Sequence, residues 1–141
     1  MRRGQAPYDD FVMDHIRNAR NYRVLELANR EKQGANPLCG DVMTVQLHVA
    51  LGRVEAAAFQ CECCGISMAS ASMMTDWVKG REVAEVRQYV RSFSGHLANR
   101  SRAAPRGADA MERALFATVR DFPARAGCAA LPWTTLEAAL A

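Results

Sequence analysis

The chain has 141 residues, of which 50% are apolar and 23% charged, and its net charge is +3. This composition predicts a single folded domain over residues 1–141 and excludes a disordered chain. The longest stretch without a charged residue, Cys63 to Thr75, has 13 residues, which is too short for a transmembrane helix of about 20. The N-terminal arginines are not followed by an apolar segment, as a secretory signal requires. We therefore expect a cytoplasmic protein whose partners are neither a membrane nor nucleic acid.

The first half of the chain predicts one helix and the strands of a small sheet. Apolar residues recur at helical spacing from Tyr8 to Arg20. Residues 24–27 could form a short strand, whereas residues 30–37, rich in charge, Gly, Asn and Pro, predict a loop or a weak edge strand. Residues 42–51 alternate as a half-buried strand does, and residues 54–60 would be its antiparallel partner across a tight turn at Gly52-Arg53.

Two helices are expected next in the chain. Residues 66–78 are mostly small, which allows close approach to another element, and Gly80 should end this helix. Residues 81–93 place valines and Phe93 on one stripe of a second helix, and Gly95 should end it.

The C-terminal third predicts a connector and two more helices. Residues 98–108 combine three arginines with Pro and Gly and should form the connector. Asp109 and Glu112 resemble a capping box at the start of a helix that ends at Pro123. Residues 128–140 should form the last helix, with Pro132 tolerated only in its first turn. The fold class is therefore α+β, with a small antiparallel three-stranded sheet packed against about five helices.

The five cysteines are an odd number, and three of them crowd into four positions. They are Cys39, Cys61, Cys63, Cys64 and Cys128. Adjacent thiols do not readily reach disulfide geometry with each other. In a reducing compartment such cysteines usually bind metal or react.

Three places in the chain could supply metal ligands. Cys39 and Asp41 lie two residues apart at a turn before a strand, and Cys64 and Cys128 each begin an expected helix. Three thiolates and one carboxylate would give the four ligands that a tetrahedral zinc site prefers. Widely spaced cysteines are equally compatible with buried structural residues. The residues alone leave these two interpretations open.

The motifs around these residues resemble a known family. Asn36-Pro37-Leu38-Cys39-Gly40-Asp41 and the segment from Cys64 to Gly80, CGISMASASMMTDWVKG, resemble the IscU/SufU/NifU family of iron–sulfur cluster assembly proteins. The opening segment at residues 13–21 and the tail at residues 122–133 are similar to the family as well. The resemblance therefore covers almost the whole chain and implies the SufU/IscU-like fold.

Two features of the sequence resemble those of the SufU subtype of this family. Gly127 stands where IscU-type members have a histidine before the third cysteine, and Cys64 and Cys128 are 64 positions apart. The resemblance implies a zinc site made of Cys39, Asp41, Cys64 and Cys128. It also implies a SufS-type cysteine desulfurase as partner, sulfur accepted as a persulfide on Cys39, and delivery to downstream iron–sulfur assembly or apo-proteins. Such a chain would be a sulfurtransferase-type accessory protein.

Two other functions remain compatible with the same ligands. The first is a scaffold on which a transient [2Fe–2S] cluster is assembled and passed on, because thiolates suit iron as well as zinc. The second is a zinc-stabilised interaction module without chemistry. The glycine at position 127 favours transfer over scaffolding.

One departure from the family pattern concerns the residues before Cys64. The family usually carries Gly-x-Gly, whereas this chain carries Cys61-Glu62-Cys63. The substitution is either drift to a small, tolerated residue, which we favour, or the sign of an additional sulfur relay or an altered ability to bind a cluster. His15 and His48 are candidate ligands by type alone, and we expect the first to be packed and the second to face away from the core.

Overall fold

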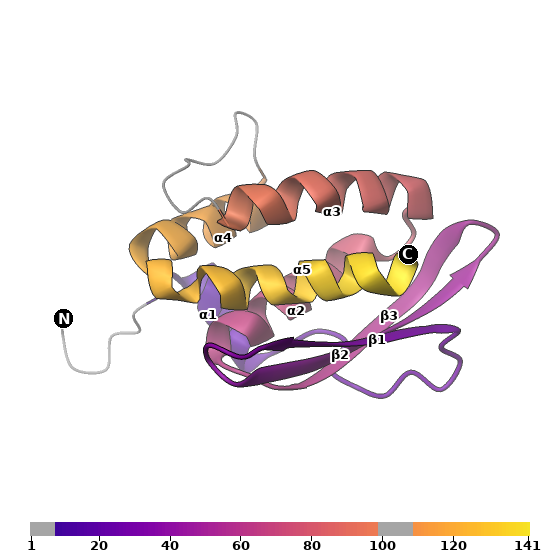
Figure 1. Cartoon of the computed structure of the whole chain (residues 1–141), viewed down its shortest axis with the longest axis horizontal. Coiled ribbons are helices and arrows are strands. Elements are labelled where there is room, and N and C mark those ends of the chain that lie inside the picture. Colours follow the sequence, from indigo (N-terminus) through magenta and orange to yellow (C-terminus); the bar gives the residue numbers. More distant parts are fainter. Residues whose placement is uncertain (1–7, 99–108) are drawn as a thin grey trace.

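The computed structural model describes residues 8–98 and 109–141, so the predicted connector lies outside the described residues except for Ala98. These residues form five α-helices and one three-stranded antiparallel sheet in the order β1-β2-β3, as the α+β prediction required. Figure 1 shows the sheet on one side, α5 across it, and α3 beyond α5. The elements are α1 (Asp10–Arg17), β1 (Arg30–Asn36), β2 (Asp41–Ala50), β3 (Arg53–Glu62), α2 (Gly65–Val78), α3 (Val83–Ala98), α4 (Ala110–Asp121), a 3-10 turn (Pro123–Arg125) and α5 (Ala126–Leu140). None of the helices in the described ranges combines the length and the apolar character needed to cross a membrane.

The hairpin of β2 and β3 turns one residue earlier than predicted. Leu51 and Gly52 form the turn, and Arg53 already pairs with Ala50. Both turn residues have positive φ, 52° and 74°, the backbone that matches the twist of a two-residue hairpin. Residues 30–37 were expected to form a loop or a weak edge strand, and the structure has the strand, β1, which pairs with β2 along its whole length.

The strand considered at residues 24–27 is wrong. The backbone N–H of Leu25 donates to Oε1 of Gln46 at 2.9 Å, and the N–H of Ala28 donates to the Leu25 carbonyl at 3.2 Å. The first bond is made to a side chain of β2 and the second closes a turn, so residues 24–27 pair with no strand of the sheet. Val24 and Leu27 are 65% and 74% exposed, which explains why an apolar run did not become a buried strand.

Two helices differ in length from the prediction. Helix α1 ends at Arg17, three residues early, because the following residues bond to α2 instead. The Arg20 N–H donates to Ser72 Oγ at 2.8 Å, and Asn21 adopts a positive φ of 64°. Helix α3 begins later than expected and continues through Gly95 to Ala98. The capping box of Asp109 and Glu112 is present at the start of α4.

Pro132 lies in the interior of α5, contrary to the expectation that it must occupy the first turn. A proline has no N–H, so the carbonyl four residues before it, that of Cys128, has no helical partner. Helix α2 supplies the replacement. Ser67 Oγ lies 3.1 Å from the Cys128 carbonyl, and Ser70 Oγ donates to the Ala129 carbonyl at 2.7 Å.

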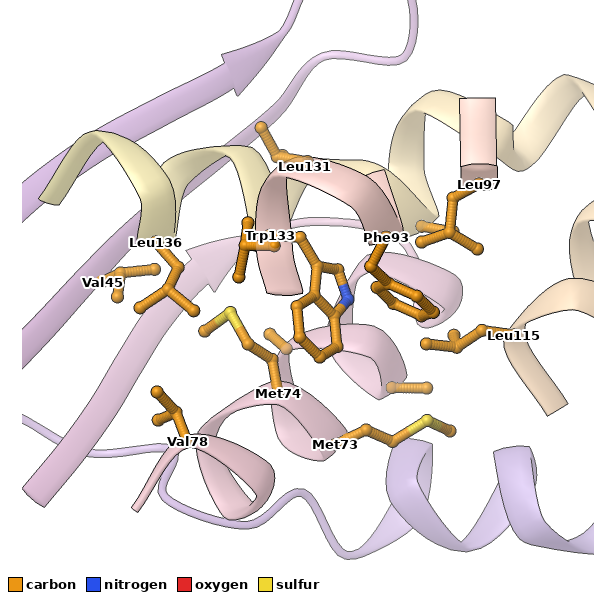
Figure 2. Close-up of a cluster of buried hydrophobic side chains, with 14 of the residues drawn as sticks. Val45, Met73, Met74, Val78, Phe93, Leu97, Leu115, Leu131, Trp133 and Leu136 are labelled. Atoms are coloured by element: carbon orange, nitrogen blue, oxygen red, sulfur yellow. The ribbon is translucent and has the colours of Figure 1, made fainter. Parts of the chain in front are cut away.

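The core lies between the sheet and the helices, with Trp133 of α5 at its centre (Figure 2). Its indole N–H donates to Ser70 Oγ at 3.0 Å, and its ring meets Phe93 edge-on at 4.6 Å between centroids. Met74 of α2 and Leu136 of α5 are fully buried beside it. The small residues of α2 thus serve two purposes, because they permit close packing and donate hydrogen bonds to α5.

Gly34 on β1 allows α5 to approach the sheet closely. A Cβ atom at this position would lie 2.0 Å from Oγ1 of Thr135 and 3.3 Å from Cδ1 of Leu131. Both residues are buried on α5, so neither can move aside freely. By contrast, a Cβ on Gly95, within α3, would meet no atom within 4 Å.

We expect Gly34→Ala to lower the free energy of unfolding by about 1–3 kcal/mol, the cost of overpacking a tight contact. The matched control, Gly95→Ala, should raise it by about 0.5–1 kcal/mol, since alanine favours a helix more than glycine. Urea denaturation of both variants beside the parent chain measures the two changes. Equal midpoints for Gly34→Ala and the parent would show that β1 and α5 are not in close contact.

Candidate metal centre

Two segments that are distant in sequence bring three possible ligands together. Cys39 lies in the turn before β2, Asp41 is the first residue of β2, and Cys128 is the third residue of α5. One ligand atom from each lies within 4.8 Å of the other two. The two sulfur atoms, Cys39 Sγ and Cys128 Sγ, are 3.1 Å apart. Three of the four residues predicted as ligands are therefore neighbours.

The turn that carries Cys39 is exposed and locally defined. The N–H groups of Cys39 and Gly40 both donate to the Asn36 carbonyl, at 3.3 Å and 2.9 Å. Gly40 has a φ of +76°, which glycine adopts without strain. Cys39 itself is exposed. The turn thus presents this thiol at the surface while β2 begins only two residues later.

Asp41 is buried yet surrounded by donors. Its Oδ1 accepts from the Cys64 backbone N–H at 3.0 Å, and its Oδ2 accepts from Ser67 Oγ at 2.6 Å. Burial alone would raise the pKa of this carboxyl. Hydrogen bonds from Ser67, Cys39, Cys64 and Cys128 outweigh it and hold the pKa of Asp41 below its usual value. The carboxylate is therefore charged and fixed in orientation.

Cys128 is the buried thiol of the group, with no exposed surface. Burial is the main reason that the pKa of this thiol is raised, and the neighbouring thiols of Cys39 and Cys64 add to it. Arg125, in the 3-10 turn, lies beside it, and its hydrogen bond to Cys128 raises the pKa of the guanidinium further. Without a cation, Cys128 would therefore remain protonated at neutral pH.

Cys64, the fourth predicted ligand, stands next to the group but is not part of it. It is the N-cap of α2, and its Sγ lies 3.7 Å from Ser67 Oγ. Its backbone N–H holds Asp41, as described above. Within the described residues, the group of close ligand atoms comprises only Cys39, Asp41 and Cys128.

Two residues that support the site were not singled out from the sequence. Ser67 contacts both Asp41 and the Cys128 carbonyl, and the amide of Asn36 lies 3.9 Å from Cys128 Sγ. Gly127 lies beside Asn36, and a Cβ at position 127 would lie 2.8 Å from the Asn36 amide nitrogen. Any larger residue at position 127, histidine included, would displace Asn36. A polar residue three positions after a helix N-cap is the signal that could have identified Ser67.

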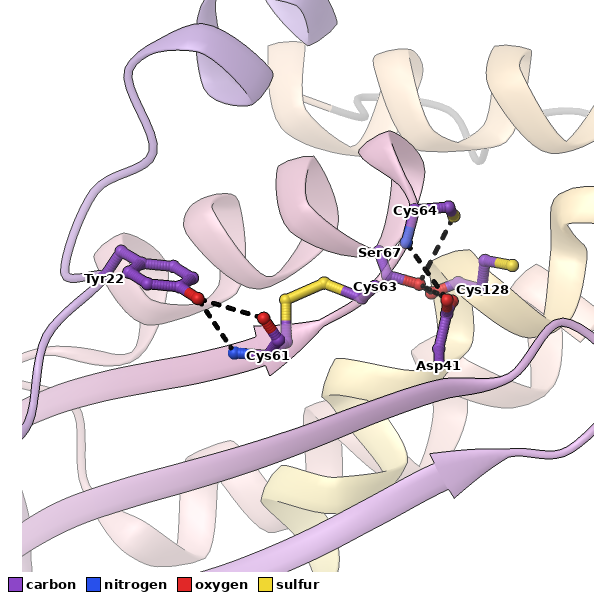
Figure 3. Close-up of a disulfide and its surroundings, with 7 residues drawn as sticks. All are labelled: Tyr22, Asp41, Cys61, Cys63, Cys64, Ser67 and Cys128. Carbon is purple, nitrogen blue, oxygen red and sulfur yellow. Dashed lines mark hydrogen bonds between the residues drawn. A yellow bond between two sulfur atoms is a disulfide. The ribbon is translucent and has the colours of Figure 1, made fainter.

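Cys61 and Cys63 form a disulfide, which the sequence analysis did not expect (Figure 3). Adjacent residues such as Cys63 and Cys64 do not readily form a disulfide with each other, but this limit does not apply to residues two apart. At the end of β3 the Cα atoms of Cys61 and Cys63 are 5.5 Å apart, within the range that disulfides span. The pair leads directly into Cys64 and α2.

The histidines do not join this group. His15 is buried, and its Nδ1 lies 2.7 Å from Ser72 Oγ. His15 is thus packed between α1 and α2, as predicted. His48, half-buried on β2, pairs in register with Ala56 of β3.

The donor set suits a thiophilic divalent ion. Two thiols and a carboxylate, with a third thiol adjacent, match the sulfur and oxygen ligands of zinc in number and type. The same thiols could bind iron. A buried carboxylate and a fully buried thiol at one point gain stability when a cation neutralises them, which makes this group a candidate metal centre.

Comparison with known proteins identifies the family. The model of the NifU-like N-terminal domain matches residues 7–129. The zinc-dependent sulfurtransferase SufU of Bacillus subtilis (strain 168) is 35% identical over 134 residues, which are 95% of this chain and 89% of SufU. One of two IscU scaffold proteins for iron–sulfur cluster assembly in Archaeoglobus fulgidus is 33% identical over 113 residues, covering 77% and 74% of the two chains.

Solved structures agree with this result. A crystal structure described as an iron–sulfur cluster assembly scaffold protein for the SUF system, from Fervidobacterium islandicum AW-1, superposes with a TM-score of 0.78 at 25% identity, covering 95% and 96% of the two chains. The fold and the sequence lead to the same conclusion. The chain belongs to the NifU-like N-terminal domain family of iron–sulfur cluster assembly proteins, together with SufU and IscU.

Proposed function

We propose that this protein accepts sulfur from a cysteine desulfurase of the SufS type in a zinc-dependent manner, with Cys39 as the acceptor. The observation that carries the proposal is the convergence of Cys39, Asp41 and Cys128 within 4.8 Å, with Cys39 alone exposed among them. The similarity to a relative named zinc-dependent sulfurtransferase supports it. The protein works in the cytoplasm in this proposal and passes the sulfur on to cluster assembly or apo-proteins.

The proposed ligands are Cys39, Asp41, Cys64 and Cys128. Bound zinc would keep the thiols deprotonated at neutral pH without taking part in redox chemistry. Cys64 is included because its thiol lies close enough to Cys128 to raise the pKa of that residue. Ser67 orients Asp41, and Asn36 contacts Cys128, so the supporting residues act on the two buried ligands.

Cys39 is the acceptor because its displacement would disturb the least regular secondary structure. Cys64 caps α2 and Cys128 lies within α5, so displacing either would disturb a helix. Cys39 lies on a four-residue turn between Asn36 and Asp41, and turns tolerate displacement better than helices do. Its thiolate would attack the outer sulfur of the persulfide on the partner. The sulfur–sulfur bond then breaks, the partner cysteine leaves as a thiolate, and Cys39 carries the persulfide.

A scaffold for a [2Fe–2S] cluster is the second candidate, favoured by the same thiol-rich donor set and by the relatives named scaffold proteins. Metal analysis of protein purified without added metal separates the two functions. About one zinc per chain, the stoichiometry of a four-ligand site, supports sulfur transfer. Iron with acid-labile sulfide and visible absorption supports the scaffold.

Cys39→Ser should abolish persulfide formation by a cysteine desulfurase and cysteine, because the attacking thiolate is gone. The measurement is alkylation trapping followed by peptide mass analysis, on parent and Cys39→Ser chains in which the Cys61–Cys63 disulfide is formed. The control variants Cys61→Ser and Cys63→Ser, which cannot form this disulfide, should still accept persulfide through Cys39. Persulfide that forms in Cys39→Ser, on any other cysteine, would overturn the assignment of the acceptor.

Removal of the metal should lower the melting temperature, because its ligands come from three distant segments. Zinc at about 1,000 times its dissociation constant adds about 4 kcal/mol, which corresponds to about 14 °C for a chain of this size. Thermal unfolding with and without a chelator measures the shift. Cys63→Ser, outside the ligand set, should show the same shift as the parent. An unchanged melting temperature after complete zinc removal would mean that these residues do not form one site.

Asp41→Ala should retain part of the zinc affinity and change the activation of the desulfurase, because a carboxylate exchanges more readily than a thiolate. We expect the affinity to fall by more than about tenfold, the lower end of the loss seen for outer-sphere partners. Asp41→Asn, which keeps an acceptor for the Cys64 N–H, separates the loss of charge from the loss of helix capping. Competition with a fluorescent zinc chelator gives the affinities. Wild-type affinity and activation in both variants would remove Asp41 from the site.

A further inference from the structure

The Cys61–Cys63 pair is the one group of reactive side chains near the candidate centre, within the described residues, to which the proposed function gives no role. The two cysteines are joined in the structure, with Cα atoms 5.5 Å apart, and both are half-buried. They lie at the end of β3 and are followed directly by Cys64. Their position therefore requires an explanation of its own.

The pair lies on the same face of the sheet as the candidate ligands. Cys61 pairs with Met43 across β2 and β3, and Asp41 precedes Met43 by two residues. Side chains two apart on a strand point to the same face, so the register, continued by two residues, places Cys63 across from Asp41. The N–H of Cys64 donates to Asp41 at 3.0 Å. Cys63 thus directly precedes Cys64, the residue whose backbone N–H binds Asp41 of the ligand group (Figure 3).

A purely structural role for this disulfide has little to stabilise. A bond between residues two apart closes a very short loop, and the stabilisation that a cross-link gives by restricting the unfolded chain becomes smaller as the loop becomes shorter. The strand end is already fixed, because Cys61 pairs with Met43. The Tyr22 hydroxyl also donates to the Cys61 carbonyl at 3.0 Å and accepts from the Cys61 N–H at 3.4 Å. These contacts fix the backbone at Cys61 without the help of the disulfide.

We propose that reduced Cys61 and Cys63 form an internal dithiol that reduces the persulfide on Cys39 and releases sulfide. The inference rests on the proposed function, since it requires sulfur to arrive on Cys39. Persulfide sulfur must gain two electrons to become sulfide, the state in which sulfur occurs in an iron–sulfur cluster. A dithiol that becomes a disulfide supplies two electrons, and the disulfide of the structure is the product of that step.

The step balances in two exchanges. The Cys63 thiolate attacks the outer sulfur of the Cys39 persulfide, the bond to Cys39 breaks, and Cys39 leaves as a thiolate that takes up the proton from Cys63. The Cys61 thiolate then attacks Sγ of Cys63, the Cys61–Cys63 bond forms, and hydrosulfide leaves with the proton of Cys61. One persulfide and two thiols are thus converted into one thiol, one disulfide and one hydrogen sulfide. An external dithiol reductant regenerates the pair for another turn.

The test uses the full chain without an added reductant and under exclusion of air. Wild type is first reduced and freed of reductant, then incubated with a cysteine desulfurase and one equivalent of cysteine. We expect about one equivalent of sulfide per chain, because one disulfide yields two electrons. Peptide mass analysis should show Cys61 and Cys63 joined and Cys39 free. Released sulfide is measured colorimetrically in the same sample.

Two matched controls remove the dithiol in different ways. The Cys61→Ser/Cys63→Ser double variant lacks the thiols, and wild type oxidised beforehand has the same sequence with the disulfide already formed. Both should carry persulfide on Cys39 and release no sulfide above the level of the desulfurase alone. The oxidised wild type keeps the test valid even where the double variant is less stable. Cys39→Ser should release no additional sulfide either.

The outcomes separate this inference from the proposed function. If reduced wild type retains the persulfide on Cys39 as the two controls do, the internal dithiol is wrong and the acceptor role of Cys39 stands. If sulfide appears without formation of the Cys61–Cys63 disulfide, or appears in Cys39→Ser, the internal dithiol is also wrong. If Cys39 carries persulfide in none of the forms, the proposed function itself fails, and this inference fails with it.

Discussion

A proline in the middle of α5 makes that helix dependent on α2. Pro132 leaves the Cys128 carbonyl without a helical hydrogen bond, and Ser67 of α2 lies within reach of it. A buried carbonyl without a partner costs about 1–3 kcal/mol, so the Ser67 hydroxyl contributes to the stability of α5. Because the same Ser67 hydroxyl also reaches Asp41, one side chain joins α2, α5 and the start of β2. The candidate centre lies where these three elements meet.

The centre combines burial with unbalanced charge, which is the condition that a metal ion relieves. Asp41 is kept ionised by its donors, while burial disfavours the thiolate form of Cys128. The guanidinium of Arg125 forms a hydrogen bond with Cys128. A divalent ion would stabilise all of these ligands together, and the exposed turn of Cys39 would leave one ligand accessible to a partner protein.

Local patterns in the sequence predicted the fold class, and the resemblance to the family predicted that Cys39, Asp41 and Cys128 lie close together. Alternating residues marked β2 and β3, and a motif around Cys39 marked the turn. Pro132 was misplaced because its missing hydrogen bond is compensated by serines that are more than sixty residues away in the chain. The strand at residues 24–27 was wrongly predicted because a short apolar run does not reveal whether its side chains are exposed to solvent. The Cys61–Cys63 bond depends on the backbone at the end of β3, which spacing alone does not define.

The sequence separation of the two neighbouring thiols in the candidate centre has a consequence for biosynthesis. Cys128 follows Cys39 by 89 positions, and α5 is the last element to leave the ribosome among those that form the centre. Domains fold as units during synthesis, so a nascent chain that ends before α5 offers neither the buried thiol nor Trp133 to hold the core. Metal binding at the candidate centre would then require that synthesis has proceeded through α5.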